Sequence, residues 1–191
     1  MAENPFRIVI HMVSSLDGYI AKKDNSVSWF ETTSHYEKGV VGQDPEEFLK
    51  SIDCYIMGSH TYELAMELSK TYGWAYGDKP TIVVSSRKLT DSRENIEFYS
   101  GDLAKLVIDR LKPNYKNVWL VGGAFLTKEF IHSGLADEIR MTILPIILGD
   151  GLPFFDAIGQ EKQLYLKDVT AYKNGMVELC YGINKEKVVN G

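Results

Sequence analysis

The sequence has no long hydrophobic run and no cluster of basic residues. Its longest apolar stretches are shorter than a membrane-spanning helix requires, and no signal-peptide pattern is present near the N-terminus. The largest basic groups are the pairs Lys22-Lys23 and Arg87-Lys88, in a chain with a net charge of −5. Binding to nucleic acid usually requires a clustered basic face. We therefore expect a cytoplasmic protein that binds neither membranes nor nucleic acid.

Cysteine and histidine are also scarce. Cys54 and Cys180 both lie in apolar, strand-like runs, so we expect buried free thiols and no disulfide. His35 and His132 show no metal-ligand spacing with each other or with a cysteine, so no metal site is expected. The sequence contains neither a GxGxxG loop nor a nucleophile elbow. A Rossmann fold and a hydrolase of the nucleophile-elbow type are therefore not supported.

Short apolar runs rich in valine, isoleucine and aromatic residues alternate with helical patterns. The strand-like runs cover residues 6–13, 51–58, 80–86, 96–100, 117–123 and 138–148. The helical patterns cover residues 44–52, with Asp44 as a possible cap, then 59–73, 102–112 and 124–134. This alternation predicts an α/β fold with a mostly parallel central sheet flanked by helices.

The C-terminal part has a different pattern. Residues 163–172 and 176–183 alternate around Asn174-Gly175, which is a strong signal for a tight hairpin turn. We expect an antiparallel hairpin to complete the sheet. No linker or repeat divides the 191 residues, so we expect a single domain over 1–191, with a frayed tail at 185–191.

Three of the predicted strands end in groups that are suited to bind phosphate. These are Gly58-Ser59-His60-Thr61, Ser85-Ser86-Arg87 and Gly122-Gly123. Each alone is also consistent with a plain turn, a helix cap or a solvated loop. Ligands of open α/β sheets bind outside the carboxyl ends of the strands, so one extended dinucleotide could use all three.

The first strand leads into the stretch SSLDGYIA at residues 14–21, which permits two interpretations. Serine, aspartate and glycine are turn formers, so the segment can be a simple turn. It can also be an opening in the chain that lets a flat ligand lie against the backbone.

These motifs, in the order SLDGYIA, YIMGSHTYE, IVVSSR, VWLVGGAFL and DEIRMTILPIILGDG, resemble the dihydrofolate reductase-like superfamily. The resemblance is strongest to the reductase domain of the bifunctional riboflavin-biosynthesis deaminase–reductase and its stand-alone relatives. It extends over residues 6–184, and SLDGYIA together with LPIILGDG is typical of that branch. The resemblance implies NADPH-dependent hydride transfer to a small heterocyclic substrate, such as a pyrimidine or a pterin.

The resemblance also implies which residues contact the cofactor. Beside the nicotinamide it places Val13, Ile20 and Ala21, where the turn would free backbone groups for the carboxamide. At the phosphates and the adenosine ribose it places Gly58, Ser59, His60 and Thr61. At the adenosine end it places Ser85, Ser86 and Arg87. At the pyrophosphate it places Gly122, Gly123, Ala124, Phe125 and Leu126, with Thr142 nearby.

The chain departs from the family pattern at the substrate. His11 stands where riboflavin-pathway reductases have a lysine, and Val121 stands where they have an acid. Ser34 lies near the place of the dihydrofolate reductase carboxylate, for which Glu31 and Glu37 are the nearest acids. His11 and Glu31 are therefore the candidate catalytic residues. A non-catalytic NADPH-binding or nucleotide-binding protein and a divergent dihydrofolate reductase remain alternatives.

Residues 141–158 are unusually apolar and predict a contact surface. Leu152, Pro153, Phe154 and Phe155 follow a glycine-rich turn, where exposure is expected. Because relatives of the riboflavin type form two-fold dimers, we expect a homodimer through this segment and the neighbouring strands. The alternative is that the C-terminal hairpin covers it.

Overall fold

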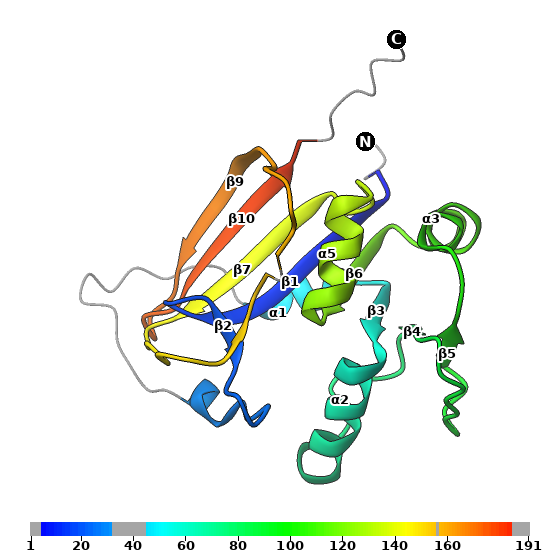
Figure 1. The fold of residues 1–191 in the computed structure, drawn as a ribbon, viewed down its shortest axis with the longest axis horizontal. Helices are drawn as coiled ribbons and strands as arrows, with labels where there is room; N and C mark the ends of the chain where they lie inside the picture. The colour runs from blue at the N-terminus through cyan, green and yellow to red at the C-terminus, as the bar shows by residue number, and fades with distance from the viewer. Residues whose placement is uncertain (1–4, 32–44, 156, 185–191) are drawn as a thin grey trace.

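The structure, a computed structural model, describes residues 5–31, 45–155 and 157–184. The chain forms an eight-stranded sheet with the order β5-β4-β3-β6-β1-β7-β10-β9 (Figure 1). Strands β1 (Arg7–Ser15), β3 (Cys54–Gly58), β4 (Thr81–Val84), β5 (Ile96–Tyr99), β6 (Asn117–Gly122) and β7 (Glu138–Leu144) run parallel to their neighbours in this group. Strand β10 (Val177–Ile183) is antiparallel to both β7 and β9 (Leu164–Ala171). The predicted α/β fold with a C-terminal hairpin is confirmed.

Both faces of the parallel strands are covered by helices, as their continuous apolar runs predicted. On one face, α5 (Ala124–His132) packs on β1 and β6, together with a helix made of α3 (Leu103–Lys105), the π-helical segment η2 (Leu106–Leu111) and α4 (Lys112–Asn114). On the other face lie α1 (Pro45–Ser51) and α2 (Ser59–Tyr72). Alternate residues of β1 enter the two cores, with Ile8 and Ile10 in one and Val9 in the other.

Several sequence expectations concern single residues. Cys54 and Cys180 are buried and free, as expected. No helix among the described residues is long and apolar enough to cross a membrane. The expected cap at Asp44, the residues Ser34, His35 and Glu37, and the tail at 185–191 lie outside the described residues.

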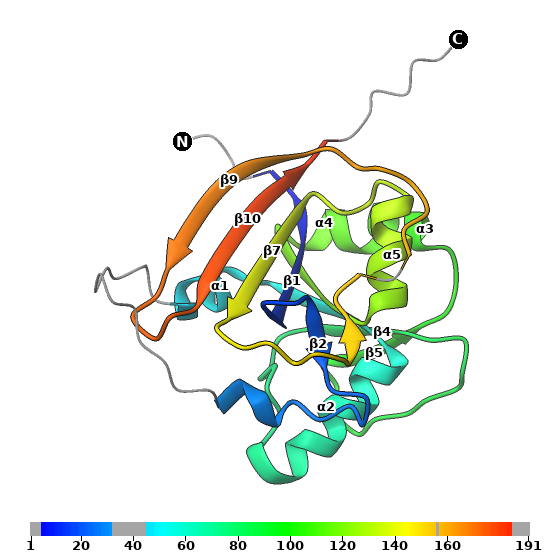
Figure 2. The same ribbon diagram turned by 60° about the vertical axis from the view of Figure 1, so that its left-hand side comes forward.

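The first strand and the β7–β8 loop are joined by a small second sheet that the sequence analysis missed. Strand β2 (Tyr19–Ala21) pairs antiparallel with β8 (Leu152–Pro153), and the 3-10 helix η1 (Ser28–Glu31) follows β2 (Figure 2). This pairing turns the chain after β8 inward. The expected exposure of the whole apolar segment is therefore wrong for Phe154, whose side chain is only 2% exposed and packs in the core. Phe155 is half-buried beside it, whereas Leu152 and Pro153 are exposed.

Exposed apolar residues gather instead on β9, the edge strand of the sheet. Leu166 and Val169 are 55% and 51% exposed. Leu166 pairs with Tyr181 of β10, and Val169 pairs with Leu179. A bulge at Lys167 shifts the register between these pairs, so Leu166 and Val169 lie on the same face of the sheet although they are three residues apart. In Figures 1 and 2, no helix of the described chain covers β9 or β10 on the face turned to the viewer. A homodimer stays a prediction, and this face of the hairpin is its expected contact surface.

The prediction can be tested on the oligomeric state. We expect the wild-type protein to scatter light as a dimer and the Leu166→Asp, Val169→Asp double variant to scatter as a folded monomer. Tyr72→Asp is the matched control, because Tyr72 is also exposed but lies on α2. A wild-type mass near the 21.6 kDa of one chain would contradict the prediction.

Candidate functional site

Two strand ends that carry predicted phosphate-binding residues lie side by side. Strands β3 and β6 are parallel neighbours, and Met57 is paired with Gly122 at their carboxyl ends. A Cβ atom on Gly58 would lie 3.9 Å from both the carbonyl oxygen of Gly122 and the amide nitrogen of Gly123. The structure thus brings the group Gly58 to Thr61 next to the group Gly122 to Leu126.

A helix begins at each of these two strand ends. Helix α2 is capped by Gly58 and α5 by Gly123, and neither helix has a side-chain cap bond to its first turn. Their leading N–H groups are therefore left for another partner, at the positive end of each helix dipole. Ser59 is the first residue of α2 and its hydroxyl does not cap the helix, so the capping explanation of this serine is not supported.

Little side-chain volume stands between these helix ends. Gly122 has φ of +125°, a conformation that residues other than glycine rarely adopt, and a Cβ there would lie 3.1 Å from the Met12 sulfur. A Cβ on Gly123 would lie 3.3 Å from the Thr61 hydroxyl oxygen. The result is a junction where a ligand can approach the main chain of both elements closely.

The third predicted group follows β4, on the far side of β3. The buried hydroxyl of Ser85 accepts the Arg87 N–H at 2.9 Å, which turns the chain, and Ser86 is exposed. The guanidinium Nη1 of Arg87 then lies 2.9 Å from Oε1 of Glu63 on α2. The loop after β4 and the first turns of α2 are thereby joined. The sequence analysis gave Glu63 no such role.

Further along, the same loop is held to α2 by residues that the sequence analysis did not single out. The Tyr62 hydroxyl donates to Asp91 at 2.5 Å. Arg93 also binds Asp91, and its guanidinium carbon lies 3.9 Å from the centre of the Trp74 ring. The hydrogen bonds from Arg93 hold the pKa of Asp91 well below its usual range, so its carboxylate is charged at neutral pH.

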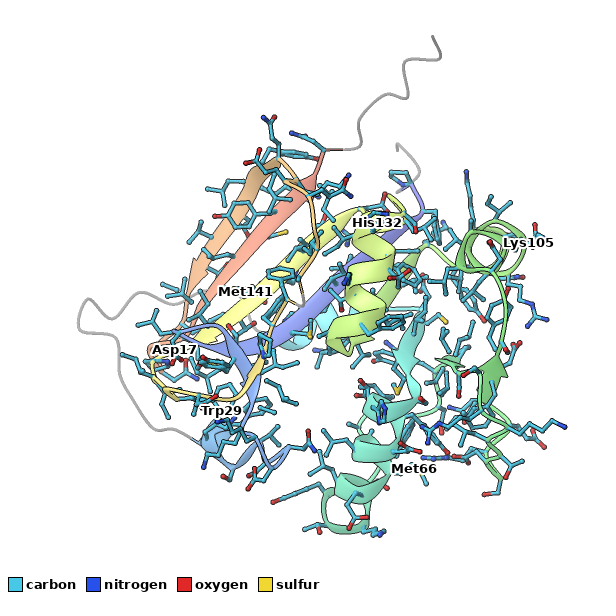
Figure 3. All side chains as sticks on the ribbon, in the orientation of Figure 1. Asp17, Trp29, Met66, Lys105, His132 and Met141 are labelled. Atoms are coloured by element: carbon cyan, nitrogen blue, oxygen red, sulfur yellow. The ribbon has the colours of Figure 1, made fainter. Side chains whose placement is uncertain are left out.

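The turn after β1 is fastened by one carboxylate. Asp17 accepts the Ser15 hydroxyl at 2.6 Å and the N–H groups of Leu148 at 3.1 Å and Gly149 at 2.8 Å. Figure 3 labels Asp17 at this junction. A Cβ on Gly151 would lie 2.2 Å from the carbonyl oxygen of Ala21, so only glycine lets the two segments pack this closely. The motifs SLDGYIA and LPIILGDG are therefore two halves of one structure.

Three backbone N–H groups of the turn after β1 are already hydrogen-bonded within the chain. The N–H of Leu16 binds the Ile146 carbonyl oxygen at 2.8 Å, and the N–H groups of Gly18 and Tyr19 both bind Ser15. The expectation that the turn frees its backbone is thus wrong for these three N–H groups. Val13 and Ile20 are partly exposed and Ala21 is buried, on either side of the turn.

His11 lies in the middle of β1, at one wall of the site. Its Nε2 is 3.2 Å from the Thr142 hydroxyl, which donates onward to Glu178 at 3.4 Å. The ring contacts Phe48 and Trp119, with ring centres 4.7 and 5.0 Å away, and these two rings also contact each other at 5.6 Å. Since Thr142 donates to Glu178, it accepts from Nε2–H of His11, and the ring's Nδ1 is left as a buried acceptor with no partner among the described residues.

Charged residues of β7 and β10 surround this histidine. Arg140 binds Glu178 at 2.5 Å, and Glu138 binds Arg7 and Lys167. The sequence analysis missed this network. The sequence does carry a sign of its β7 half: Glu138, Arg140 and Thr142 alternate along an otherwise apolar strand, so all three lie on one face of the sheet.

The surroundings fix the charge of His11. Burial, helped by the positive charge of Arg140, lowers the pKa of His11 from 6.5 to about 3. The imidazole is therefore neutral at physiological pH, and His11 is a hydrogen-bonding residue rather than a cationic acid. The other catalytic candidate, Glu31, ends η1, but its side chain is outside the described part of the chain.

The chain is similar to known proteins over nearly its whole length. The profile of the RibD C-terminal domain matches residues 7–178. The chain belongs to this family. The RibD C-terminal domain is a reductase domain, which agrees with the resemblance seen in the sequence. The uncharacterized Bacillus subtilis protein YwjB is 31% identical over 176 residues, which cover 92% of this chain and 97% of YwjB.

Solved structures agree on the fold. A Shewanella sp. PV-4 protein assigned to riboflavin biosynthesis superposes with a TM-score of 0.80 at 22% identity, covering 94% of this chain and all of that one. Dihydrofolate reductase from Enterococcus faecalis, complexed with NADP(H), superposes with a TM-score of 0.56 at 16% identity, covering 94% and 97%. The dihydrofolate reductase-like fold is confirmed.

The neutral state of His11 predicts a pH-dependent stability. Unfolding exposes the imidazole, which then takes up a proton below pH 6.5, whereas the folded protein stays neutral there down to about 3. Stability is therefore lost as the pH falls below 6.5, by about 2 kcal/mol between pH 7 and pH 5 from this one group. We expect urea unfolding of His11→Gln to lack this part of the loss.

His132, an exposed histidine, supplies the control for this experiment. His132→Gln removes an imidazole from the surface and should follow the wild-type pH dependence. Parallel curves for the wild type and His11→Gln would contradict the prediction.

Proposed function

We propose that this protein is an NADPH-dependent reductase that transfers hydride to a C=N or C=O bond of a small nitrogen heterocycle. The observation that carries the proposal is the pair of adjacent helix N-termini at Gly58 and Gly123, which have no side-chain caps. Two such ends side by side suit the two charges of a pyrophosphate. The Enterococcus reductase of the same fold, which was solved with NADP(H), supports the choice of cofactor.

The order of the strands supports one orientation of a bound dinucleotide. A pyrophosphate between β3 and β6 has β4 on one side and β1 on the other. The β4 side offers Ser85, Ser86 and the exposed Arg87, which suit a ribose and its phosphate. The β1 side offers His11 and the network around it, which suit a reacting ring. We therefore assign the adenosine to β4 and the nicotinamide to β1.

When bound, NADPH would supply the hydride, and the residues of the chain would bind and orient the partners. Gly58, Gly123 and the first turns of α2 and α5 would hold the phosphates through main-chain N–H groups. The turn after β1, fixed by Asp17, would limit the position of the nicotinamide and keep water from it. At the cofactor, the protein would contribute binding and orientation and no covalent step.

The wall around His11 would receive the substrate. Phe48 and Trp119 pack as apolar rings against the imidazole. Thr142 with Glu178 would hold the imidazole in the tautomer whose Nδ1 is an acceptor. This Nδ1 is buried and has no partner among the described residues, and it is the atom that an N–H or amino group of the heterocycle would have to reach. A neutral imidazole offers no charge to a phosphate, so a substrate without phosphate at this point fits better than a ribosylaminopyrimidine phosphate.

Cofactor binding should be visible as a thermal shift. NADPH at a hundred times its dissociation constant should raise the melting temperature by roughly 5–10 °C. Gly123→Val should abolish the shift, because its side chain would fill the junction and press on Thr61. Gly58→Ala is the milder variant: its methyl group meets Gly122 and Gly123 at an ordinary 3.9 Å, so the fold is kept while the approach to the helix ends is narrowed.

Turnover is tested separately from binding. NADPH oxidation should be screened with pterins, dihydrofolate and aminopyrimidines with and without a phosphate. Oxidation with an unphosphorylated heterocycle supports the proposal. A thermal shift without oxidation of NADPH by any of them would identify a nucleotide-binding protein instead, and no shift at all would overturn the proposal.

A further inference from the structure

Glu63 lies on the first turns of α2, beside Arg87 of the loop after β4. It is the fifth residue of α2, and its carboxylate binds Arg87 at 2.9 Å through one oxygen and lies 3.6 Å from Nδ1 of His60 through the other. The side chains of Glu63 and Arg87 are 42% and 48% exposed. The hydrogen bond from Arg87 lowers the pKa of Glu63, so the carboxylate is charged at neutral pH.

This position bears on the choice between NADPH and NADH. The assignment of the adenosine to the β4 side, which rests on the proposed function, places its ribose beside Arg87 and the first turns of α2. The two cofactors differ only at the 2′ position of that ribose, where NADPH carries a phosphate and NADH a hydroxyl. A guanidinium favours the phosphate, whereas a carboxylate accepts a hydrogen bond from the hydroxyl and repels the phosphate.

The ion pair offers both groups at one point. Because both side chains are substantially exposed, their mutual attraction is weak and a phosphate can compete for Arg87. Glu63 remains nearby after such a displacement, since it is fixed on α2 by its backbone. A single charge about 5 Å from a phosphate of charge near −2 weakens binding in water by about tenfold.

We infer that Glu63 is a specificity-determining residue that lowers the preference for NADPH over NADH, so that NADPH is favoured by no more than about tenfold. Arg87 provides the attraction for the 2′-phosphate and Glu63 offsets it. The ratio of the two affinities is then set by this pair of side chains and not by the helix ends, which meet the pyrophosphate shared by both cofactors.

The test is a set of dissociation constants for NADPH and NADH, measured with the purified protein by the fluorescence of the bound reduced nicotinamide. In the wild type we expect the two constants to lie within about tenfold of each other. Glu63→Gln should increase the preference for NADPH about tenfold. Arg87→Ala should weaken NADPH roughly ten- to hundredfold and NADH much less.

Glu67→Gln is the matched control. Glu67 lies four residues further along α2, is 68% exposed, and pairs with Lys70 instead of Arg87. This variant makes the same change in net charge, and the ratio of affinities should stay at the wild-type value.

The outcomes separate the two proposals. If both cofactors bind but Glu63→Gln leaves their ratio unchanged, or changes it no more than Glu67→Gln does, the inference about Glu63 is wrong while the proposed function stands. A wild type that strongly prefers NADPH would also overturn it. If neither cofactor binds the wild-type protein, the proposed function fails and the inference fails with it.

Discussion

The parallel pairing of β1, β3, β4 and β6 is the constraint on which the rest of the structure depends. Parallel neighbours require the chain to cross over between strands, so every strand in this group ends at the same edge of the sheet. The two helix N-termini at Gly58 and Gly123 meet because β3 and β6 are adjacent. Strands β4 and β1 lie on either side of them, in the two directions along which the proposed dinucleotide would extend.

The opposite half of the site is built on a different principle. His11 is surrounded by charged residues of β7 and β10 that are largely buried, and such groups are costly unless each finds a partner. Arg140 with Glu178, and Glu138 with Arg7 and Lys167, meet this condition within one sheet face. The antiparallel addition of β10 beside β7 is what brings Glu178 opposite Thr142. The hairpin thus completes the wall of the site as well as the sheet.

Local patterns in the sequence were sufficient for the strands, the helices and the residues at the strand ends. Apolar runs, glycine pairs and the Asn174-Gly175 turn depend on a few adjacent residues, and the structure confirms the elements that they predicted. The polar network could not be predicted in this way, because it depends on the register between β7 and β10 across 36 positions of the chain. Phe154 was misplaced for a similar reason: its burial follows from the pairing of β2 with β8.

The carboxylate of Asp17 joins two segments at the edge of the candidate site. It holds the turn after β1 and the loop after β7 through three hydrogen bonds to one side chain, while β2 and β8 join the same two segments again through their main chains. Displacing either segment alone would break the hydrogen bonds from Leu148 and Gly149 to Asp17. We therefore expect the turn and the loop to move together, so that a ligand that shifts the turn also shifts a loop more than a hundred residues away in sequence.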